Sequence, residues 1–357
     1  MGFDSFVGNR KIVDRLVRKL HEDRFPHGLI FSGVEGLGKH TLALMVAKAL
    51  NCTGVGEPAI AQAKGPPEAA YRSGLAGGPD AQKTSRAGEF CDQCSNCRKI
   101  NSGSHPDVMT VSVEDEATQI KIAQIRRILE MLDLKPLEGR NKVYIIDPAN
   151  LLNTEAANAI LKGLEEPPAN TFFILITVNV YELLLTVRSR SQVYNFTPLT
   201  LNEIRHHGIT DELVIRWSQG SIGRARSLNM PQLKTEREAI VEFLETALTA
   251  SQDRFQELLG VSAELGRAKQ GFETRMAILT MLIADLLYIK QGLPEKVVNI
   301  DFQTRLGRLA GRITVNQLIL MSDFVRTIES GLKSNVNRQI MTDILAISAN
   351  EILHGLS

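Results

Sequence analysis

A glycine-rich loop followed by a lysine is the part of this sequence best suited to phosphate chemistry. Residues 33–39 read GVEGLGK, with a short apolar run before them and a helix-forming stretch after them, which is the pattern of a phosphate-binding loop. Glycines let backbone N–H groups converge on phosphate oxygens, and the start of a helix adds partial positive charge. The candidate phosphate-binding residues are Gly33, Gly36, Gly38 and Lys39.

The next two residues depart from the pattern of a nucleotide hydrolase. His40 stands where such loops carry the Ser or Thr whose hydroxyl coordinates Mg²⁺, and neutral imidazole suits a hard cation poorly. Thr41 lies one residue further along the helix, rotated by about 100°, so it should not take over this role. The sequence therefore predicts a nucleotide site, formed with His40 and Thr41, in which Mg²⁺ is badly placed.

A second departure lies at an acidic strand end. Asp147 follows the apolar run 143–146, at the position of a carboxylate that organises Mg²⁺. Pro148 comes next, where related ATPases commonly have a Glu that orients the attacking water, and proline offers no carboxylate. These two departures together predict a site that does not hydrolyse nucleotide. Alternatively, another carboxylate replaces the missing base in an in-line geometry. The candidates are Glu155, Glu165 and Glu166.

Three more polar features belong to the predicted site. Thr177 follows the apolar run 172–176, at the edge where open α/β sheets hold ligands, and would either sense a γ-phosphate or cap a loop. Residues 188–191 (RSRS) contain two guanidinium groups of the kind that stabilise phosphoryl transfer, although surface arginines are usually only solvated or ion-paired. Arg224 would either contact bound nucleotide or be an exposed residue at a helix start.

The four cysteines form a separate metal-binding pattern. Three of them are spaced as CxxCxxC, and together they match the ligand set of a closed, tetrahedral structural zinc site. An iron–sulfur cluster is the rival, but the ferredoxin pattern requires a further Cys-Pro. The predicted ligands are Cys52, Cys91, Cys94 and Cys97. Residues 54–88 are rich in Gly, Pro and Ala without periodicity, which predicts a flexible insertion between the first ligand and the others.

Strand-like apolar runs alternate with helical patterns in the first part of the chain. This alternation predicts an α/β domain with a parallel sheet and helices on both faces. The expected strands are 29–31, 108–113, 143–146, 172–176 and 193–196, and the expected helices are 9–22, 41–50, 122–132 and 153–165. After Pro198 the pattern is helical, with long helices near 236–249, 270–291, 313–332 and 336–354.

Composition sets limits on the function. The 357 residues are 43% hydrophobic and 23% charged, which describes a folded chain of two or three domains. The net charge of +1 argues against binding nucleic acid by bulk charge. We see no apolar run long enough to span a bilayer and no secretion signal. We therefore expect a cytoplasmic protein that does not associate with a membrane.

Together these residues resemble the clamp-loader branch of the AAA+ ATPases. The resemblance covers most of residues 5–197, and its most specific parts are residues 161–168 (LKGLEEPP) and the cysteines after the phosphate-loop helix. It implies a P-loop AAA+ domain at 1–197 with a cysteine module at 52–97, a helical lid domain at 198–232 and an all-α collar domain for oligomerisation at 233–357.

The resemblance also implies roles for the site residues. In this family the loop at Ser189-Arg190-Ser191 carries an arginine finger, Arg190, that acts in trans on a neighbour's ATP. Position 191 is commonly Cys there, and Ser191 departs from that pattern. The family's motor subunits keep an intact phosphate loop and a Glu after the acidic strand, so His40 and Pro148 set this chain apart from them.

We therefore expect a rigid, non-hydrolysing stator that at most binds ATP and contains structural zinc. Its implied partners are gamma/tau and delta subunits in a hetero-pentamer of the DNA polymerase III holoenzyme, a DNA-directed DNA polymerase, which places a sliding clamp on primed DNA during replication. One alternative is an active gamma/tau-type ATPase, which Lys39 and Asp147 support. Another is a zinc-containing nucleic-acid-binding module, which the near-neutral charge opposes.

Overall fold

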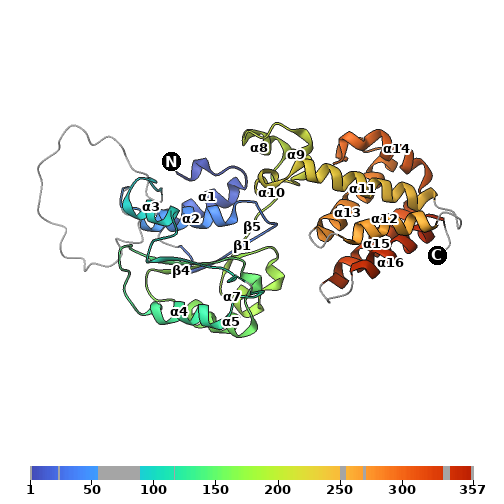
Figure 1. Ribbon diagram of the computed structural model, residues 1–357. Helices are drawn as coiled ribbons and strands as arrows, with labels where there is room; N and C mark the ends of the chain where they lie inside the picture. Colours follow the sequence, from blue (N-terminus) through green and yellow to red (C-terminus); the bar gives the residue numbers. More distant parts are fainter. Residues whose placement is uncertain are drawn as a thin grey trace, which may run out of the picture. The chain divides into compact units, whose positions relative to one another are not determined.

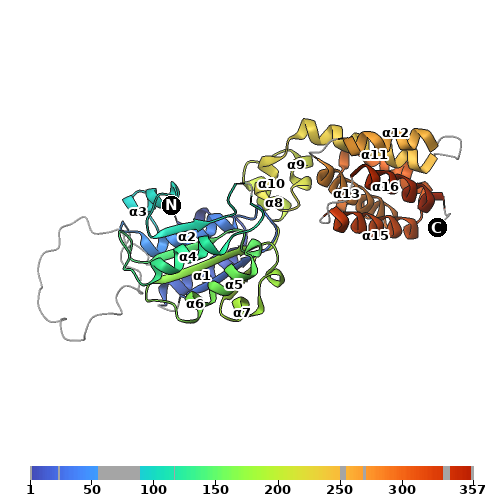
Figure 2. The ribbon, with the colours of Figure 1, turned by 60° about the horizontal axis from the view of Figure 1, so that its bottom comes forward.

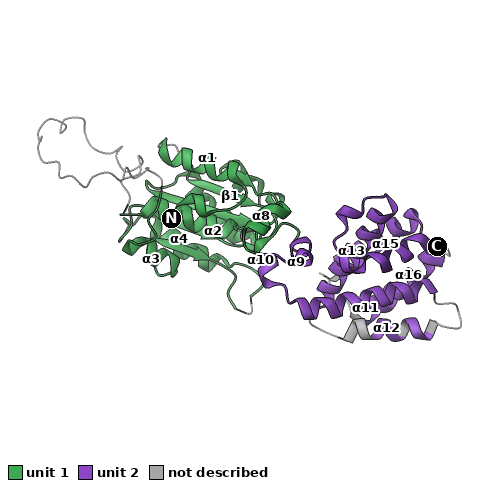
Figure 3. Ribbon diagram, turned by 90° about the horizontal axis from the view of Figure 1, so that it is seen from above, with its two compact units in different colours: residues 1–208, 219–224 green, residues 209–218, 225–357 purple. Residues whose placement is uncertain are grey.

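The chain forms two compact units in the computed structural model. The structure describes residues 2–22, 25–54, 89–115, 117–249, 255–267, 271–332 and 338–354. One unit comprises Met1–Gly208 with Gln219–Arg224, and the other comprises Ile209–Ser218 with Ala225–Ser357 (Figure 3). The predicted flexible insertion at 54–88 lies, after its first residue, outside the described residues.

A five-stranded parallel sheet forms the centre of the first unit (Figure 1). Its strand order is β2-β3-β4-β1-β5. The strands are β1 (Gly28–Ser32), β2 (Val108–Val111), β3 (Lys142–Ile146), β4 (Thr171–Thr177) and β5 (Gln192–Asn195). Every residue of β1, β3 and β4 is buried, as expected for parallel strands covered on both faces. The predicted α/β class with a parallel sheet is confirmed.

Helices cover both faces of this sheet because successive side chains of a strand point to opposite sides. The helices form two groups, one on each face of the sheet (Figures 1 and 2). Leu29 and Phe31 of β1 pack into the core under one group, whereas Ile30 packs into the core under the other. The first group is α1 (Arg10–His21), α2 (Lys39–Asn51) and α3 (Ser95–Asn101). The second is α4 (Ile122–Leu132), α5 (Thr154–Ala159), α6 (Leu161–Glu165) and α7 (Leu185–Ser189).

The helix predicted at 153–165 is divided into α5 and α6. Asn153 begins α5 by accepting a hydrogen bond from the N–H of Ala156 at 2.8 Å. At Ile160 the carbonyl accepts the N–H of Gly163, three residues later, which tightens the backbone between the two helices. The pair Pro167-Pro168 then prevents α6 from continuing.

Three short helices occupy the region in which the sequence predicts a lid domain at 198–232. They are α8 (Leu201–His206), α9 (Glu212–Trp217) and α10 (Ile222–Ser227). The two compact units divide these helices between them. The three-domain division, with boundaries at 1–197, 198–232 and 233–357, therefore stays a prediction.

The second unit is helical and shares one apolar core. Its long helices are α11 (Met230–Thr249), α12 (Phe255–Arg267), α13 (Phe272–Lys290), α14 (Gln303–Arg312), α15 (Val315–Leu332) and α16 (Arg338–His354). The four long helices predicted from the sequence are confirmed. The sequence analysis did not single out α12 and α14, each of which contains two glycines that lower its intrinsic helix propensity.

Short 3-10 helices connect several of these elements. They are η1 (Phe3–Ser5), η3 (Ala149–Leu151), η4 (Val180–Glu182), η6 (Pro294–Lys296) and η7 (Ile300–Phe302). Among the helices that the structure describes, none has the combined length and apolar character needed to cross a membrane.

A fully buried guanidinium links α11 to the segment before α14. Arg237 is 0% exposed, donates from Nε to Asn299 Oδ1 at 2.7 Å and forms an ion pair with Asp301. Its guanidinium carbon lies 4.5 Å from the ring centre of Phe302, and Trp217 donates to the same Asn299 oxygen at 3.2 Å. Because a buried charge is costly unless it is paired, this network should depend on every member.

Replacing Arg237 by Met should lower the free energy of unfolding by about 3 kcal/mol, because Asn299 and Asp301 lose their charged donor inside the unit. Chemical denaturation of the full chain measures this change. The matched control is Arg312→Met, since Arg312 is exposed at the end of α14 and its loss should change stability by less than about 0.5 kcal/mol. Equal effects of the two substitutions would contradict the role of the buried network.

Candidate functional site

The carboxyl ends of three neighbouring strands place most of the predicted nucleotide site at one edge of the sheet. Ser32 at the end of β1 pairs in register with Thr177 at the end of β4, and Asp147 directly follows β3. The glycine loop leaves β1 and enters α2, whose first residue is Lys39. The predicted residues gathered at this edge are Gly33, Gly36, Gly38, Lys39, His40, Asp147 and Thr177.

Lys39 is held by its own loop. Its side chain is 6% exposed, and Nζ donates to the carbonyl of Val34 at 2.7 Å and to the carbonyl of Gly33. Burial lowers the pKa of Lys39, and the nearby carboxylates of Asp147 and Glu35 oppose that shift. The ammonium group that would bind terminal phosphates is thus engaged with backbone oxygens.

His40 and Asp147 are hydrogen-bonded to each other. Nδ1 of His40 lies 2.9 Å from Oδ2 of Asp147, and the two side chains are 43% and 29% exposed. The residue that replaces the Mg²⁺-binding hydroxyl therefore binds the very carboxylate that would organise Mg²⁺. Position 40 therefore offers a cation no hydroxyl, and Oδ2 of Asp147 is engaged by the imidazole.

The two threonines of the predicted site do different things. Thr177 is 1% exposed, and its Oγ1 donates to the carbonyl of Asn179 at 3.0 Å while accepting the N–H of Asn179 at 3.2 Å. This geometry corresponds to the loop-capping alternative for Thr177. Thr41 is exposed in the first turn of α2 and is not drawn into the His40–Asp147 pair.

The segment Gln219–Arg224 packs directly on the glycine loop. The N–H of Gly223 donates to the carbonyl of Gly36 at 3.0 Å. Gly36 has φ +74, and a Cβ there would lie 2.2 Å from Oγ of Ser221, so no larger residue fits. The backbone of Arg224 is therefore close to the loop, while its guanidinium donates to Oε1 of Gln219 at 2.9 Å.

Arg190 lies at the opposite edge of the sheet. It follows α7 and precedes β5, whose Gln192 pairs with Leu29 near the amino end of β1. From Leu29 to the phosphate loop, β1 extends about 10 Å at roughly 3.3 Å per residue. The structure thus separates Arg190 from this chain's own phosphate loop. The other arginine of the loop, Arg188, stacks on Tyr181 with its guanidinium carbon 5.3 Å from the ring centre.

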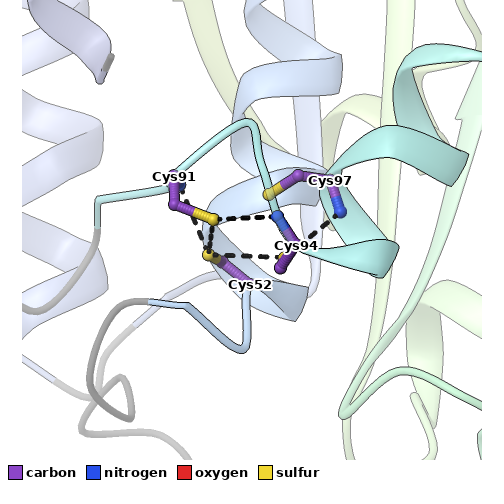
Figure 4. A group of neighbouring side chains, drawn as sticks. All are labelled: Cys52, Cys91, Cys94 and Cys97. Carbon is purple, nitrogen blue, oxygen red and sulfur yellow. Dashed lines mark hydrogen bonds between the residues drawn. The ribbon is translucent and has the colours of Figure 1, made fainter.

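The four cysteines converge, although the first is far from the others in sequence (Figure 4). Their sulfur atoms all lie within 4.8 Å of one another. Cys52 Sγ is 3.5 Å from Cys91 Sγ and 3.9 Å from Cys94 Sγ. A tetrahedral zinc with Zn–S bonds of about 2.3 Å requires sulfur atoms about 3.8 Å apart. The cluster is close enough to bind a metal ion of this size.

Backbone N–H groups point at the sulfur atoms of the cluster. Cys91 N–H donates to Cys52 Sγ at 3.4 Å, Cys94 N–H to Cys91 Sγ at 3.3 Å, and Cys97 N–H to Cys94 Sγ at 3.4 Å. Such backbone donors stabilise thiolates, which are the form that binds metal. The side-chain hydrogen bond between Cys52 and Cys97 lowers the pKa of Cys52 and raises the pKa of Cys97.

Buried asparagines join the cysteine cluster to the sheet. Asn51, which precedes the first cysteine, is 0% exposed, and its Oδ1 accepts the N–H groups of Arg140 and Asn141 at 2.9 Å each. Asn96, between two cysteines, donates to the carbonyl of Asn51 at 2.8 Å. The sequence analysis missed these residues, whose only signal is an amide side chain next to a predicted ligand.

The cysteine geometry predicts one tightly bound divalent metal ion per chain. We expect Cys91→Ser to lose this metal and to lower the melting temperature, because the segments around residues 52 and 91 would no longer be cross-linked. Elemental analysis and thermal unfolding of the purified chain measure both effects. Gln93→Ala is the matched control, since Gln93 offers no sulfur. Wild-type protein that purifies without metal and melts unchanged after chelation would contradict the prediction.

Sequence comparisons agree with this architecture. A family model described as DNA polymerase III, delta subunit, matches residues 80–200, and one described as its C terminal matches residues 231–347. The chain is similar to DNA polymerase III subunit delta' of Bacillus subtilis, with 26% identity over 348 residues, or 96% of each protein. It is also similar to DNA polymerase III subunit tau of Escherichia coli, with 30% identity over 239 residues.

The tau alignment covers 63% of this chain and 32% of tau, so the chain spans about a third of that relative. Among solved structures, a gamma subunit-related protein of Thermotoga maritima gives a TM-score of 0.38 at 15% identity, covering 96% of this chain and 99% of the other. The clamp loader delta protein of B. subtilis gives 0.28 at 12% identity, covering 72% and 90%. On the family models and the end-to-end relative, the chain belongs to the clamp-loader subunit family of DNA polymerase III.

Proposed function

We propose that this chain is a delta prime-type subunit of the DNA polymerase III clamp loader, a non-hydrolysing stator. In this role it helps the loader place a sliding clamp on primed DNA during replication in the cytoplasm. The end-to-end similarity to a delta' subunit supports the subunit type, because the tau relative aligns over 63% of the chain only. The proposed partners are gamma/tau and delta subunits in a hetero-pentamer, with the clamp and DNA contacted through the complex.

The hydrogen bond between His40 and Asp147 is the observation that carries the non-hydrolysing part of this proposal. Phosphoryl transfer in P-loop enzymes needs Mg²⁺ between a loop hydroxyl and an acidic oxygen. Here the hydroxyl is absent, and Oδ2 of Asp147 is 2.9 Å from the imidazole. Pro148 supplies no base, and the carboxylate of Glu165, one proposed substitute, is paired with Arg190 at 2.8 Å.

The contacts of the glycine loop support the same conclusion. The ammonium of Lys39 is bound to loop carbonyls, and the carbonyl of Gly36 accepts a hydrogen bond from Gly223. A triphosphate that entered this site would have to draw the ammonium of Lys39 away from these carbonyls. We accordingly propose that ATP binds weakly or not at all at this loop, where its contacts would be Lys39, Thr41 and Arg224. Any ATP that binds there is not hydrolysed.

The position of Arg190 supports a role on another subunit's nucleotide. An arginine at the amino edge of the sheet is about 10 Å of strand away from its own phosphate loop, but it lies on a loop with 36% of its side chain exposed. Guanidinium groups supplied in trans stabilise the charge that develops during phosphoryl transfer. Arg190 is therefore proposed as the catalytic residue that this chain lends to a neighbouring ATPase subunit.

We also propose that the cysteine cluster holds structural zinc. Four thiolates leave no open coordination position, so the metal would cross-link the end of α2 to α3 and supply no catalytic chemistry. The N–H groups of Cys91, Cys94 and Cys97 would orient and stabilise the sulfur ligands.

An active gamma/tau-type ATPase is the second candidate, because Lys39 and Asp147 are retained and tau is 30% identical over the shared region. The two candidates differ in a simple assay. We expect the purified chain alone, with ATP and Mg²⁺, to release no phosphate above background, since its cation ligands are missing or engaged. A reconstituted loader measured in parallel controls for the assay. Steady turnover by the isolated chain would overturn the stator proposal.

A second assay tests the finger. In a reconstituted loader, Arg190→Ala should reduce hydrolysis at the site it serves by about 10³- to 10⁵-fold. DNA-stimulated ATPase activity is measured. The total activity of the loader should fall by the fraction that this one site contributes. The control is Arg127→Ala, which removes an exposed arginine of α4 in the same unit. Unchanged ATPase activity with Arg190→Ala would eliminate the proposed role in trans.

A further inference from the structure

Arg190 has a defined set of partners in this chain. Its Nη2 lies 2.8 Å from Oε1 of Glu165, and its Nη1 donates to the carbonyl of Thr186 at 3.1 Å and to Oγ of Ser189 at 3.3 Å. The side chains of Arg190 and Glu165 are 36% and 47% exposed. The guanidinium is thus held in one orientation at a surface that a second protein can reach.

Packing around Gly28 fixes the backbones on which the two charged residues stand. A Cβ on Gly28 would lie 3.0 Å from the carbonyl oxygen of Arg190, 2.9 Å from Oγ of Ser191 and 3.0 Å from Cδ2 of Leu164. The first residue of β1, the end of α6 and the loop of Arg190 therefore meet at one point. Because Leu164 precedes Glu165, this junction sets the separation of the carboxylate and the guanidinium.

The position of Glu165 at the end of its helix is unfavourable for a carboxylate. Glu165 is the last residue of α6, where the partial negative charge of the helix end disfavours a carboxylate. Another acid, Glu166, follows immediately and adds like-charge repulsion. The favourable charge interaction of Glu165 in the structure is with Arg190.

We propose that Glu165 is a positioning residue for Arg190, a counter-ion that holds the guanidinium in the free subunit and yields it to a neighbour's triphosphate. The inference rests on the proposed function of Arg190 and extends it. An exposed ion pair is weak, whereas a triphosphate carries more negative charge than the single carboxylate of Glu165 and also offers two oxygens to the guanidinium fork. The exchange of partners is therefore favourable once the triphosphate is present.

This competition has a kinetic signature in the reconstituted loader. Glu165→Gln keeps the side-chain shape and removes the charge that competes with the triphosphate. The apparent KM for ATP should fall roughly two- to five-fold, the range expected for an exposed pair, while kcat changes by less than about two-fold. Glu165→Asp, which keeps the charge, should move the apparent KM back toward the wild-type value.

Two controls separate this effect from a general loss of structure. The matched control is Glu182→Gln, an exposed carboxylate of η4 in the same unit, which should leave kcat and KM unchanged. Glu165→Gln combined with Arg190→Ala should behave as Arg190→Ala alone, because the carboxylate acts only through the arginine. Melting temperatures of all variants confirm that each is folded.

The outcomes distinguish the inference from the proposed function. If Arg190→Ala is defective and Glu165→Gln leaves the apparent KM unchanged or raises it, the role of Glu165 is wrong and the finger stands. If Arg190→Ala has no effect, the finger itself is wrong. A further change on adding Glu165→Gln to Arg190→Ala would also overturn the role, since it would show an action of Glu165 that bypasses the arginine.

Discussion

The parallel direction of all five strands is the constraint on which the sites of this chain depend. Because every strand runs the same way, every carboxyl end meets at one edge and every amino end at the other. The phosphate loop, Asp147 and Thr177 therefore gather at one edge, and Arg190, which precedes β5, is left at the opposite edge. The sheet thus separates the residues of the phosphate loop from Arg190, the residue proposed to act on another protein.

At the first edge, side chains that could bind a cation or a phosphate make contacts within the chain instead. An imidazole binds the carboxylate at 2.9 Å, a lysine binds loop carbonyls, and Gly223 binds the loop at Gly36. The first two of these contacts use groups that a hydrolase would reserve for Mg²⁺ or phosphate. The same residues that identify the loop as a phosphate-binding type therefore stabilise it as an element of structure.

Much of this could be predicted from the sequence because the signals are local. The glycine spacing, the apolar runs before Asp147 and Thr177, and the cysteine spacing each involve neighbouring residues, and the strands and most helices follow from periodicity. The pairing of Glu165 with Arg190 could not be predicted, since it joins the end of α6 to the loop before β5 through a junction at Gly28. Helix α14 was missed for a related reason, because core packing by Leu306 and Leu309 outweighs its glycines.

The junction at Gly28 has a consequence beyond this chain. A methyl group added there would meet atoms of Leu164 in α6 and of Arg190 and Ser191 in the loop before β5 at about 3 Å, and that loop would have to shift. Under the role proposed for Arg190, such a substitution at the start of β1 would slow catalysis in a different polypeptide whose own sequence is unchanged.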